Sequence, residues 1–431
     1  MISDSPLAYP FSLCLFSTAA TYIASVLTSN VSQVDRLWTF LPTIYTAYFA
    51  LGPLWPEEPT SVGGVWIPFV PFVPAQLHAQ YPRDERTGAL TVPTRALVLL
   101  TLINLWMLRL SYNTFRRGLF SLADEDYRWA VLRRQLNARF GAVAGQVVFQ
   151  IVNLTFIAGI QNVLLMGLGW PAYLAVTQTP TTGSATLVTT DYLLALWALG
   201  VLAVEFTADN QQFVFQTYKH ALLAPGKPQA QANTHALRRA SAVAWPCASP
   251  ETDLTLTPAD ARRGFLTSGL WRYSRHPNFA CEQTFWWIIC AIPAFSFLSP
   301  SLFTSFSLTT LIPFLPAVAL SLLFLSSTAY TEAISASKYP RPYSAYQKRV
   351  PMFGAVPLLG AFAVPALVAL PVLLFRGGWR GIVEVMRGPV GCALDNGSLR
   401  TVWWRVAAGD EERRKVEMLV WGEDGEDEKM K

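Results

Sequence analysis

The sequence predicts an all-α protein, a polytopic membrane bundle of about seven or eight transmembrane helices, and three observations support this prediction. Charged residues make up 14% of the 431 residues, whereas soluble domains carry about 25%. Hydrophobic residues make up 52%, and 15 Trp are among the aromatic residues. Several apolar runs also reach the roughly 20 residues that a membrane-spanning helix needs. A membrane protein can turn this much apolar surface toward lipid.

The apolar runs divide the chain into spans and connections. Seven runs are predicted to span the membrane: 11–29, 37–55, 93–112, 145–168, 189–207, 283–303 and 306–329. A further run, 355–375, contains three prolines, so we expect an extra transmembrane or re-entrant helix there. The expected organisation is a transmembrane domain over 1–353 with a cytosolic loop at 207–276, the extra helix within 354–375, and a tail over 376–431. The tail mixes basic and acidic residues, which is typical of a solvated or disordered segment.

The charges of the connections predict the orientation of the chain. Residues 109–139 contain seven Arg, 207–276 contain eight Lys or Arg, and 338–349 contain four. In contrast, residues 169–190 and 297–306 contain no charged residue. Because cytoplasmic loops collect Lys and Arg, the three basic segments are expected on the cytosolic face. The N-terminus is then expected on the opposite side.

The cysteines and the N-terminal run indicate neither a metal site nor a cleaved leader. The five cysteines have no C-x-x-C spacing and are interpreted as packing thiols: Cys14, Cys247, Cys281, Cys290 and Cys392. No Lys or Arg precedes Arg36, so the first apolar run lacks the basic start of a secretory signal. We expect it to be a retained helix.

One stretch, "LWRYSRHPNFACEQTFWW" over residues 270–287, gathers charged and polar residues directly before an apolar run. Pro277 suits the first turn of a helix, where its missing N–H costs nothing. His276 would then lie near the N-cap, with Asn278 and Glu282 one turn apart on the same face.

Basic residues flank this expected helix start. Its free N–H groups make an anion site, and the guanidinium groups of Arg272 and Arg275 match phosphate oxygens in pairs. The stretch therefore suits a pyrophosphate or a carboxylate at the membrane surface. The alternative is a basic anchor with an interfacial belt of Trp and Tyr.

A second polar cluster lies at the end of the fifth predicted span, in "EFTADNQQFVFQ". Acids at the end of a span are costly unless they face protein, water or ligand. The cluster is either a helix end that reaches into the cytosol or the polar wall of a cofactor groove. Spacing of i, i+4, i+7 and i+11 puts four residues on one helical face: Glu205, Asp209, Gln212 and Gln216.

Two further clusters combine basic and aromatic residues. In "LRLSYNTFRRG" (108–118), helical spacing brings together Arg109, Asn113 and Arg116. In "SKYPRPYSAYQKRVPMF" (337–353), tyrosines including Tyr343 could stack on an adenine ring while Lys348 and Arg349 meet phosphates. The alternatives are a stop-transfer flank and an interfacial Tyr/Lys belt. Together the four clusters could wrap an elongated anion such as a dinucleotide. No G-x-G-x-x-G motif is present, so helices and loops would have to hold it.

These segments resemble the steroid 5-alpha-reductase C-terminal domain superfamily, and most of all its membrane branch with the "RHPN" signature. "GLWRYSRHPNFACE" is similar to G-L-W-x-Y-S-R-H-P-N-Y-x-x-E, and "EFTADNQQFVF" is similar to E-x-x-A-D-x-Q-x-x-x-F. "DRLWTFLP", "RLSYNTFRRG" and "YPRPYSAYQKRVP" have the expected look and order. The resemblance covers about residues 30–353.

The resemblance implies an NADPH-dependent reductase of an activated C=C bond in a lipid such as a steroid, a sterol or an enoyl chain. By motif position, it implies that the cofactor is held by Asp209, Arg272, Tyr273, Arg275, His276, Asn278, Glu282, Tyr343 and Arg349.

Two departures from the family pattern bear on the chemistry. Phe279 and Ala280 stand where the family usually has Tyr and often Gly. The second predicted span also lacks the acidic residue with which steroid reductases engage a substrate ketone. Only Tyr45 and Tyr48 could polarise a carbonyl from that position, and with Glu282 they are the candidate catalytic acids.

Two other functions stay open on the sequence. One is an S-adenosylmethionine-dependent methyltransferase, because R-H-P also occurs in membrane isoprenylcysteine methyltransferases. The other is a non-catalytic membrane scaffold of the same fold. The expected partners are a lipid substrate and the bilayer, with no nucleic acid, no metal and no indicated oligomeric state. Lipid chemistry and multiple spans favour the endoplasmic reticulum.

Overall fold

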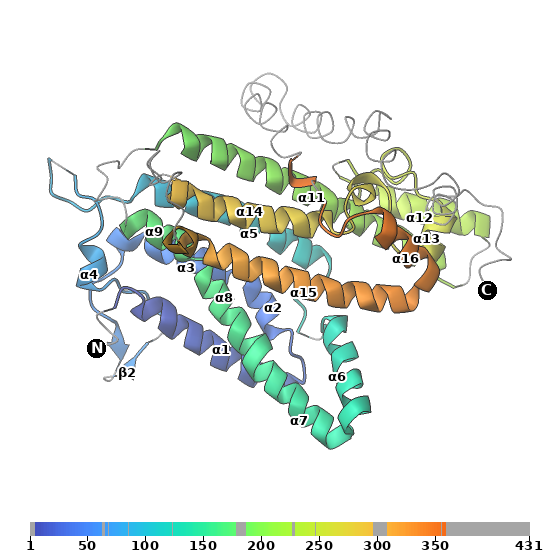
Figure 1. Cartoon of the computed structure of the whole chain (residues 1–431), viewed down its shortest axis with the longest axis horizontal. Helices are drawn as coiled ribbons and strands as arrows, with labels where there is room; N and C mark the ends of the chain where they lie inside the picture. Colours follow the sequence, from blue (N-terminus) through green and yellow to red (C-terminus); the bar gives the residue numbers. More distant parts are fainter. Residues whose placement is uncertain are drawn as a thin grey trace. The chain divides into compact units, whose positions relative to one another are not determined.

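The computed structural model describes residues 5–358, except 63–64, 68, 85, 123, 178–186, 226–228, 246, 296–307 and 355 (Figure 1). The tail predicted over 376–431 lies outside the described residues, and so does nearly all of the predicted helix 355–375. Only the short 3-10 turn η7 (Val356–Leu358) is described there.

The chain forms two compact units. The first comprises Met1–Ala195 and Trp286–Leu322, and the second comprises Leu196–Phe285 and Leu323–Lys431. Three long helices contribute residues to both units: α11 (Thr189–Leu223), α14 (Pro277–Phe295) and α15 (Leu315–Lys338).

The first unit is helical apart from one small antiparallel hairpin. In this hairpin β1 (Ser61–Val62) pairs with β2 (Val65–Trp66). The longer helices are α1 (Ala8–Thr28), α5 (Thr94–Arg116), α6 (Tyr127–Phe140) and α7 (Ala142–Val152). The helix of α7 continues through the π-helical stretch η3 (Asn153–Ile160) into α8 (Gln161–Gly167) and α9 (Trp170–Thr177). Shorter elements are α2 (Gln33–Trp38), α3 (Leu41–Ala50), η2 (Gly52–Leu54), α4 (Ala75–His78) and η6 (Leu308–Phe314).

The first unit is held by an apolar core and one buried ion pair. The rings of Trp106 and Trp286, both fully buried, meet edge to face with their centroids 5.1 Å apart. Near the beginnings of α5 and α11, Arg95 pairs with Asp191 at 2.9 Å, and both side chains are buried. Breaking such a pair would leave an uncompensated buried charge, so it fixes these two helix starts together.

Five described helices are long and apolar enough to cross a membrane, where the sequence predicted seven or eight. They cover Ala8–Thr28, Thr94–Arg116, Ala142–Thr177, Thr189–Leu223 and Leu311–Lys338. The all-helical membrane class is confirmed by these helices, and the number of spans is not.

Two predicted spans account for the difference among the described residues. The run 37–55 folds as short pieces, and α3 has only 10 residues. At 1.5 Å per residue it extends about 15 Å, half of the roughly 30 Å hydrocarbon core. The run 283–303 coincides in part with α14, whose first half carries Asn278, Glu282 and Gln283. These polar residues lower its apolar character, and α14 is not among the five.

The second unit contains most of the predicted cytosolic loop, which is largely helical. Helix α11 extends beyond the predicted span 189–207 to Leu223, and its polar residues Asp209, Asn210 and Gln211 are buried. It is followed by α12 (Gln229–Ser241), α13 (Pro258–Arg263), the 3-10 turn η4 (Gly269–Arg272) and the start of α14. The end of α15 leads into α16 (Pro340–Arg349). A core around Phe215, Tyr218 and Trp271 joins α11, α12, α13 and η4.

The cysteines fit the packing role predicted for them. All four cysteines in the described part of the chain are buried thiols outside any disulfide: Cys14, Cys247, Cys281 and Cys290. Cys392 lies outside the described residues.

Candidate functional site

The candidate site is built around the segment between η4 and the start of α14, in the second unit. Helix α14 begins at Pro277, as the sequence predicts, and the Ala280 N–H donates to the His276 carbonyl at 3.0 Å. Just upstream, Gly269 adopts φ +60°, a conformation that glycine reaches without strain. A Cβ on Gly269 would lie 2.6 Å from Gln211 Oε1, so only glycine fits against α11 here.

Gln211 and Trp271 attach this segment to α11. The Leu270 N–H donates to Gln211 Oε1 at 2.9 Å, and Gln211 Nε2 donates to the Cys247 carbonyl at 3.0 Å. Trp271 Nε1 donates to the Ala208 carbonyl at 3.2 Å. These bonds place η4 directly beside Asp209, the next residue of α11.

A buried acid on α15 collects three partners, and we call Arg275, His276, Glu332 and Gln347 the closed cluster. Arg275 donates to both carboxylate oxygens of Glu332, from Nε at 2.6 Å and from Nη2 at 2.9 Å. His276 Nε2 lies 3.0 Å from Glu332 Oε1, and Gln347 Nε2 donates to Oε2 at 3.0 Å. The Glu332 residue is 3% exposed.

The closed cluster fastens the chain that follows α16 to the start of α14. Arg275 Nη1 donates to the carbonyls of Gln347 and Val350. The main-chain N–H groups of Arg275 and His276 donate to the carbonyls of Pro351 and Met352 at 3.0 and 3.1 Å. Four of the five N–H groups of Arg275 therefore already meet protein oxygens. In this structure Arg275 and His276 therefore position the segment, and their predicted contact with a cofactor stays a prediction.

The tyrosines of α16 lie in a small core. The ring of Phe265 contacts those of Tyr343 and Tyr346 at centroid distances of 5.0 and 5.3 Å. Both tyrosines are buried, and burial raises the pKa of each phenol above its usual value. Tyr346 also donates to the Trp271 carbonyl. The predicted stacking of Tyr343 on an adenine ring does not fit this packing, because the ring already faces protein.

A second set of polar groups comes from α11 and from the same segment between η4 and α14. We call Asp209, Gln212, Arg272 and Asn278 the open cluster. Asn278 Nδ2 donates to Asp209 Oδ1 at 3.1 Å, across 69 positions of the chain. The oxygen atom of this amide, Asn278 Oδ1, is buried and has no hydrogen-bond partner among the described residues. Gln212, one turn beyond Asp209 on α11, likewise has a buried Oε1 without a partner.

Arg272 is the basic residue of the same segment, at the end of η4. It follows Trp271, which is bonded to α11 next to Asp209. Arg272 is half-buried, and within the described part of the chain its guanidinium has no hydrogen bond or ion pair. Buried polar atoms in native proteins nearly always have partners, so these groups indicate a place for a ligand with both hydrogen-bond donors and anionic oxygens.

The remaining predicted residues of the second unit vary in burial. Glu282, one turn after Asn278 on α14, is 5% exposed, and Glu205 on α11 is also buried. Tyr273 and Arg349 are half-buried, and Lys348 is exposed near the end of α16. Phe279, the departure from the family pattern, stacks on His276 with the ring centroids 5.6 Å apart.

The other predicted residues belong to the first unit. Helical spacing on α5 correctly paired two of them: Arg116 donates to Asn113 Oδ1 from Nε at 3.1 Å and from Nη2 at 2.9 Å. Arg109 is half-buried on the same helix. Tyr45 and Tyr48 lie fully buried on α3, and Tyr48 Oη donates to the Pro6 carbonyl at 3.4 Å. The meeting of these residues with those of the second unit stays a prediction.

Sequence reasoning missed the centre of the closed cluster. Glu332 is the one acid in the apolar run "LPAVALSLLFLSSTAYTEAIS". A solitary acid in such a run is a functional or pairing residue by default, so the signal was present. Gln211 and Gln347 gave no comparable signal, because their roles depend on partners far away in the sequence.

Comparison with known proteins places the chain in a family. Residues 81–350, more than half of the chain, match the family described as "Protein of unknown function (DUF1295)". The chain belongs to this family, and both clusters lie inside the matched range. It is 25% identical over 338 residues to an uncharacterized protein of Schizosaccharomyces pombe, which covers 76% of this chain and 74% of that protein. No solved structure matches the chain.

Proposed function

We propose that the chain is a membrane-embedded, NADPH-dependent reductase of a C=C bond in a lipid of the steroid, sterol or enoyl type. The observation that carries the proposal is the open cluster, where two buried oxygen atoms without partners lie beside a buried carboxylate. The resemblance of these segments to the steroid 5-alpha-reductase superfamily supports the same choice of cofactor. We also infer a location in the endoplasmic reticulum, with the N-terminus on the non-cytosolic side.

The residues of the open cluster fit the hydrogen-bonding groups of NADPH. The amide and ribose hydroxyls of the dinucleotide are donors, and Asn278 Oδ1 and Gln212 Oε1 need donors to offset their burial. Its phosphates are acceptors, and Arg272 would hold one of them. Lys348 and Arg349, near the end of α16, would contribute further charge toward the phosphates. When bound, NADPH would supply the hydride.

The reduction also needs a proton at the second carbon of the double bond. Glu282 is the candidate of the second unit, because it is buried one turn from Asn278. A carboxyl at this position could act as the general acid. Tyr45 and Tyr48 are the candidates of the first unit, where each could polarise a conjugated carbonyl through its phenol.

Ligand-dependent thermal stability of the detergent-purified protein tests the proposal. A ligand that binds the folded state raises the midpoint of unfolding, so NADPH should raise it while NADH and S-adenosylmethionine do not. A rise with S-adenosylmethionine alone would favour a methyltransferase. If none of the three ligands raises the unfolding midpoint, a scaffold is favoured. Either of these two results would overturn the proposal.

Two variants locate the binding site in the same assay. Asn278→Leu and Arg272→Gln should each abolish most of the NADPH-dependent rise. The matched controls are Gln283→Leu, whose amide bonds only within α14, and Arg239→Gln, which is exposed on α12. The controls should respond to NADPH as the wild type does. An undiminished response of Asn278→Leu would remove the open cluster from the site.

A further inference from the structure

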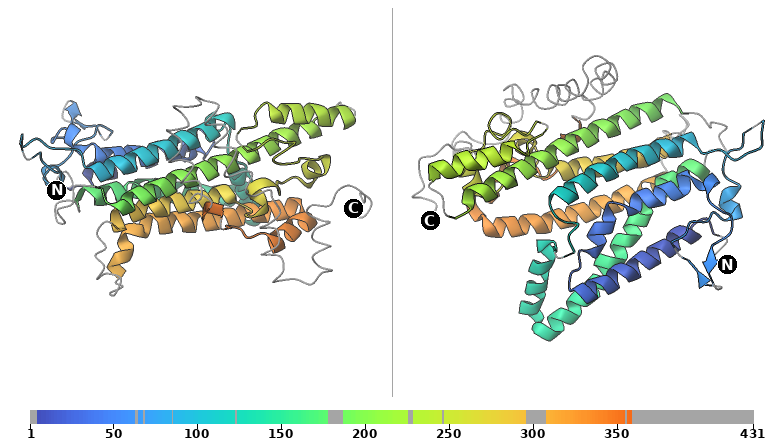
Figure 2. Two further views of the ribbon diagram at one scale, coloured as in Figure 1. Left: turned by 90° about the horizontal axis from the view of Figure 1, so that it is seen from above. Right: turned by 180° about the vertical axis from the view of Figure 1, so that it is seen from behind.

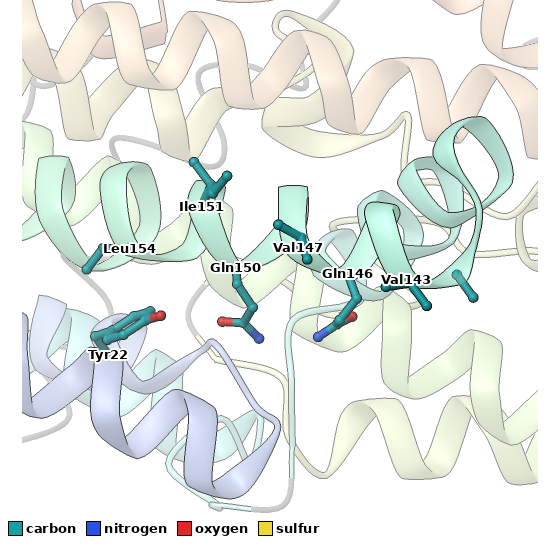
Figure 3. A pocket seen from close by; sticks show the side chains of 8 residues that line it. Tyr22, Val143, Gln146, Val147, Gln150, Ile151 and Leu154 are labelled. Carbon is teal, nitrogen blue, oxygen red and sulfur yellow. The ribbon is translucent and has the colours of Figure 1, made fainter.

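A groove in the first unit is lined by no residue of the closed or the open cluster. It has a volume of about 610 Å³ and is bounded by Tyr22 of α1 and by residues of α7 and the start of η3 (Figure 3). Four apolar residues form its floor at helical spacing: Val143, Val147, Ile151 and Leu154. Each of these side chains is between 46% and 81% exposed, as expected for apolar residues that face lipid.

Two amides interrupt this apolar wall. Gln146 and Gln150 are one turn apart on α7, and Figure 3 shows both amides and the Tyr22 ring directed at the same gap. Gln150 Oε1 accepts from Asn153 Nδ2 at 3.2 Å, but the Gln150 NH₂ group has no acceptor in the described chain. The Gln146 amide and the Tyr22 hydroxyl likewise have no partner among the described residues.

Unpaired donors on a lipid-facing wall need an acceptor from the lipid. Inside the hydrocarbon region no water is present to satisfy them, and a polar side chain there costs free energy. Gln146 and Gln150 lie about 6 and 12 Å along α7 from Ala142, at 1.5 Å per residue. The ester carbonyls of a diacyl phospholipid, next to its headgroup, are the acceptors that such a lipid offers to these donors.

The helix before the groove supplies the complementary charge. Helix α6 folds back on α7 as a hairpin (Figure 2), and Gly145 is packed so closely on Asn137 that a Cβ would lie 2.7 Å from Asn137 Cα. Two of its four arginines are paired, Arg128 with Asp126 and Arg133 with Glu125.

The other two arginines of α6 have no carboxylate partner among the residues that the structure describes. Arg134 donates only to the Ala130 carbonyl, and Arg139 lies over the ring of Phe140. Both side chains are exposed. We propose that α6 and the groove between α1 and α7 form a binding site for one anionic diacyl phospholipid. Its ester carbonyls accept from Gln146, Gln150 and Tyr22, one acyl chain lies along the floor, and its phosphate meets Arg134 and Arg139.

Native mass spectrometry of the detergent-purified protein tests this site without NADPH, so its outcome is separate from that of the proposed reductase. The probes are diacyl phosphatidylglycerol, its di-O-alkyl analogue without ester carbonyls, and diacyl phosphatidylcholine. The wild type should retain one diacyl phosphatidylglycerol several-fold better than either of the other two. Equal retention of the di-O-alkyl analogue would overturn the role of the amides.

Variants assign the contacts in the same measurement. Gln146→Leu/Gln150→Leu places apolar side chains toward lipid, which the fold tolerates, and should reduce retention several-fold. Arg134→Gln/Arg139→Gln should remove the preference for phosphatidylglycerol over phosphatidylcholine. The control is Thr155→Val, exposed on η3 outside the groove, and it should retain lipid normally. Wild-type retention by the double Gln variant, or an equal loss in the control, would overturn the proposal.

Discussion

The closed and open clusters come from one short motif, yet their polar groups differ in what satisfies them. In "WRYSRHPN", Arg275 and His276 meet Glu332, Gln347 and main-chain carbonyls. Arg272 lies three residues before Arg275, and Asn278 lies two after His276. The guanidinium of Arg272 and the Oδ1 atom of Asn278 have no partner within the described part of the chain. The same residue types therefore serve two purposes. The closed cluster is a structural brace that holds the start of α14, and the open cluster is a candidate ligand site.

The contrast between Arg275 and Arg272 shows that charge in a motif does not by itself identify a ligand contact. Arg275 and Arg272 are equivalent in the sequence, but only Arg275 has a buried carboxylate opposite it. A brace that is already satisfied holds the helix start in place, which is what a preorganised site requires. The unsatisfied groups beside it then have a fixed geometry for a ligand.

The largest effect is expected from breaking the brace. Glu332→Ala leaves Arg275 as an uncompensated buried cation and should lower the free energy of unfolding by about 3–5 kcal/mol. The midpoint of thermal unfolding in detergent measures the loss. Arg275→Met/Glu332→Leu, which removes both charges, should recover much of it. A Glu332→Ala protein as stable as the wild type would show that the closed cluster is not a brace.

A smaller effect of the opposite sign is expected in the open cluster. Gln212→Met keeps the shape of the side chain but removes the buried Oε1 that has no partner. The free energy of unfolding without nucleotide should stay unchanged or rise by about 1 kcal/mol. The NADPH-dependent rise in the unfolding midpoint should shrink in the same protein. A loss of stability as large as that of Glu332→Ala would mean that Gln212 is structural.

Local features of both clusters could be predicted from the sequence. Pro277 marked the start of α14, and helical spacing paired Asn113 with Arg116 on α5. These predictions succeeded because helix geometry relates residues that are only a few positions apart. The apolar runs likewise predicted the membrane class.

Other features depend on distant contacts and could not be predicted. Arg275 and Glu332 are 57 positions apart, and nothing local in the motif distinguishes a braced arginine from a free one. The run 37–55 looked long enough to span, but it breaks into α2, α3 and η2. Helical spacing placed Asp209 and Gln212 on one face of α11, but the pairing of Asp209 with Asn278 across 69 positions could not be read from spacing.

A structure of the protein determined with NADPH tests most directly whether Arg272 and Asn278 bind the ligand while Arg275 only positions the segment. The account predicts dinucleotide density within about 3 Å of Asn278 Oδ1 and Gln212 Oε1, a phosphate on Arg272, and an intact pair between Arg275 and Glu332. A phosphate held by Arg275, with Glu332 displaced and the open cluster empty, would contradict it.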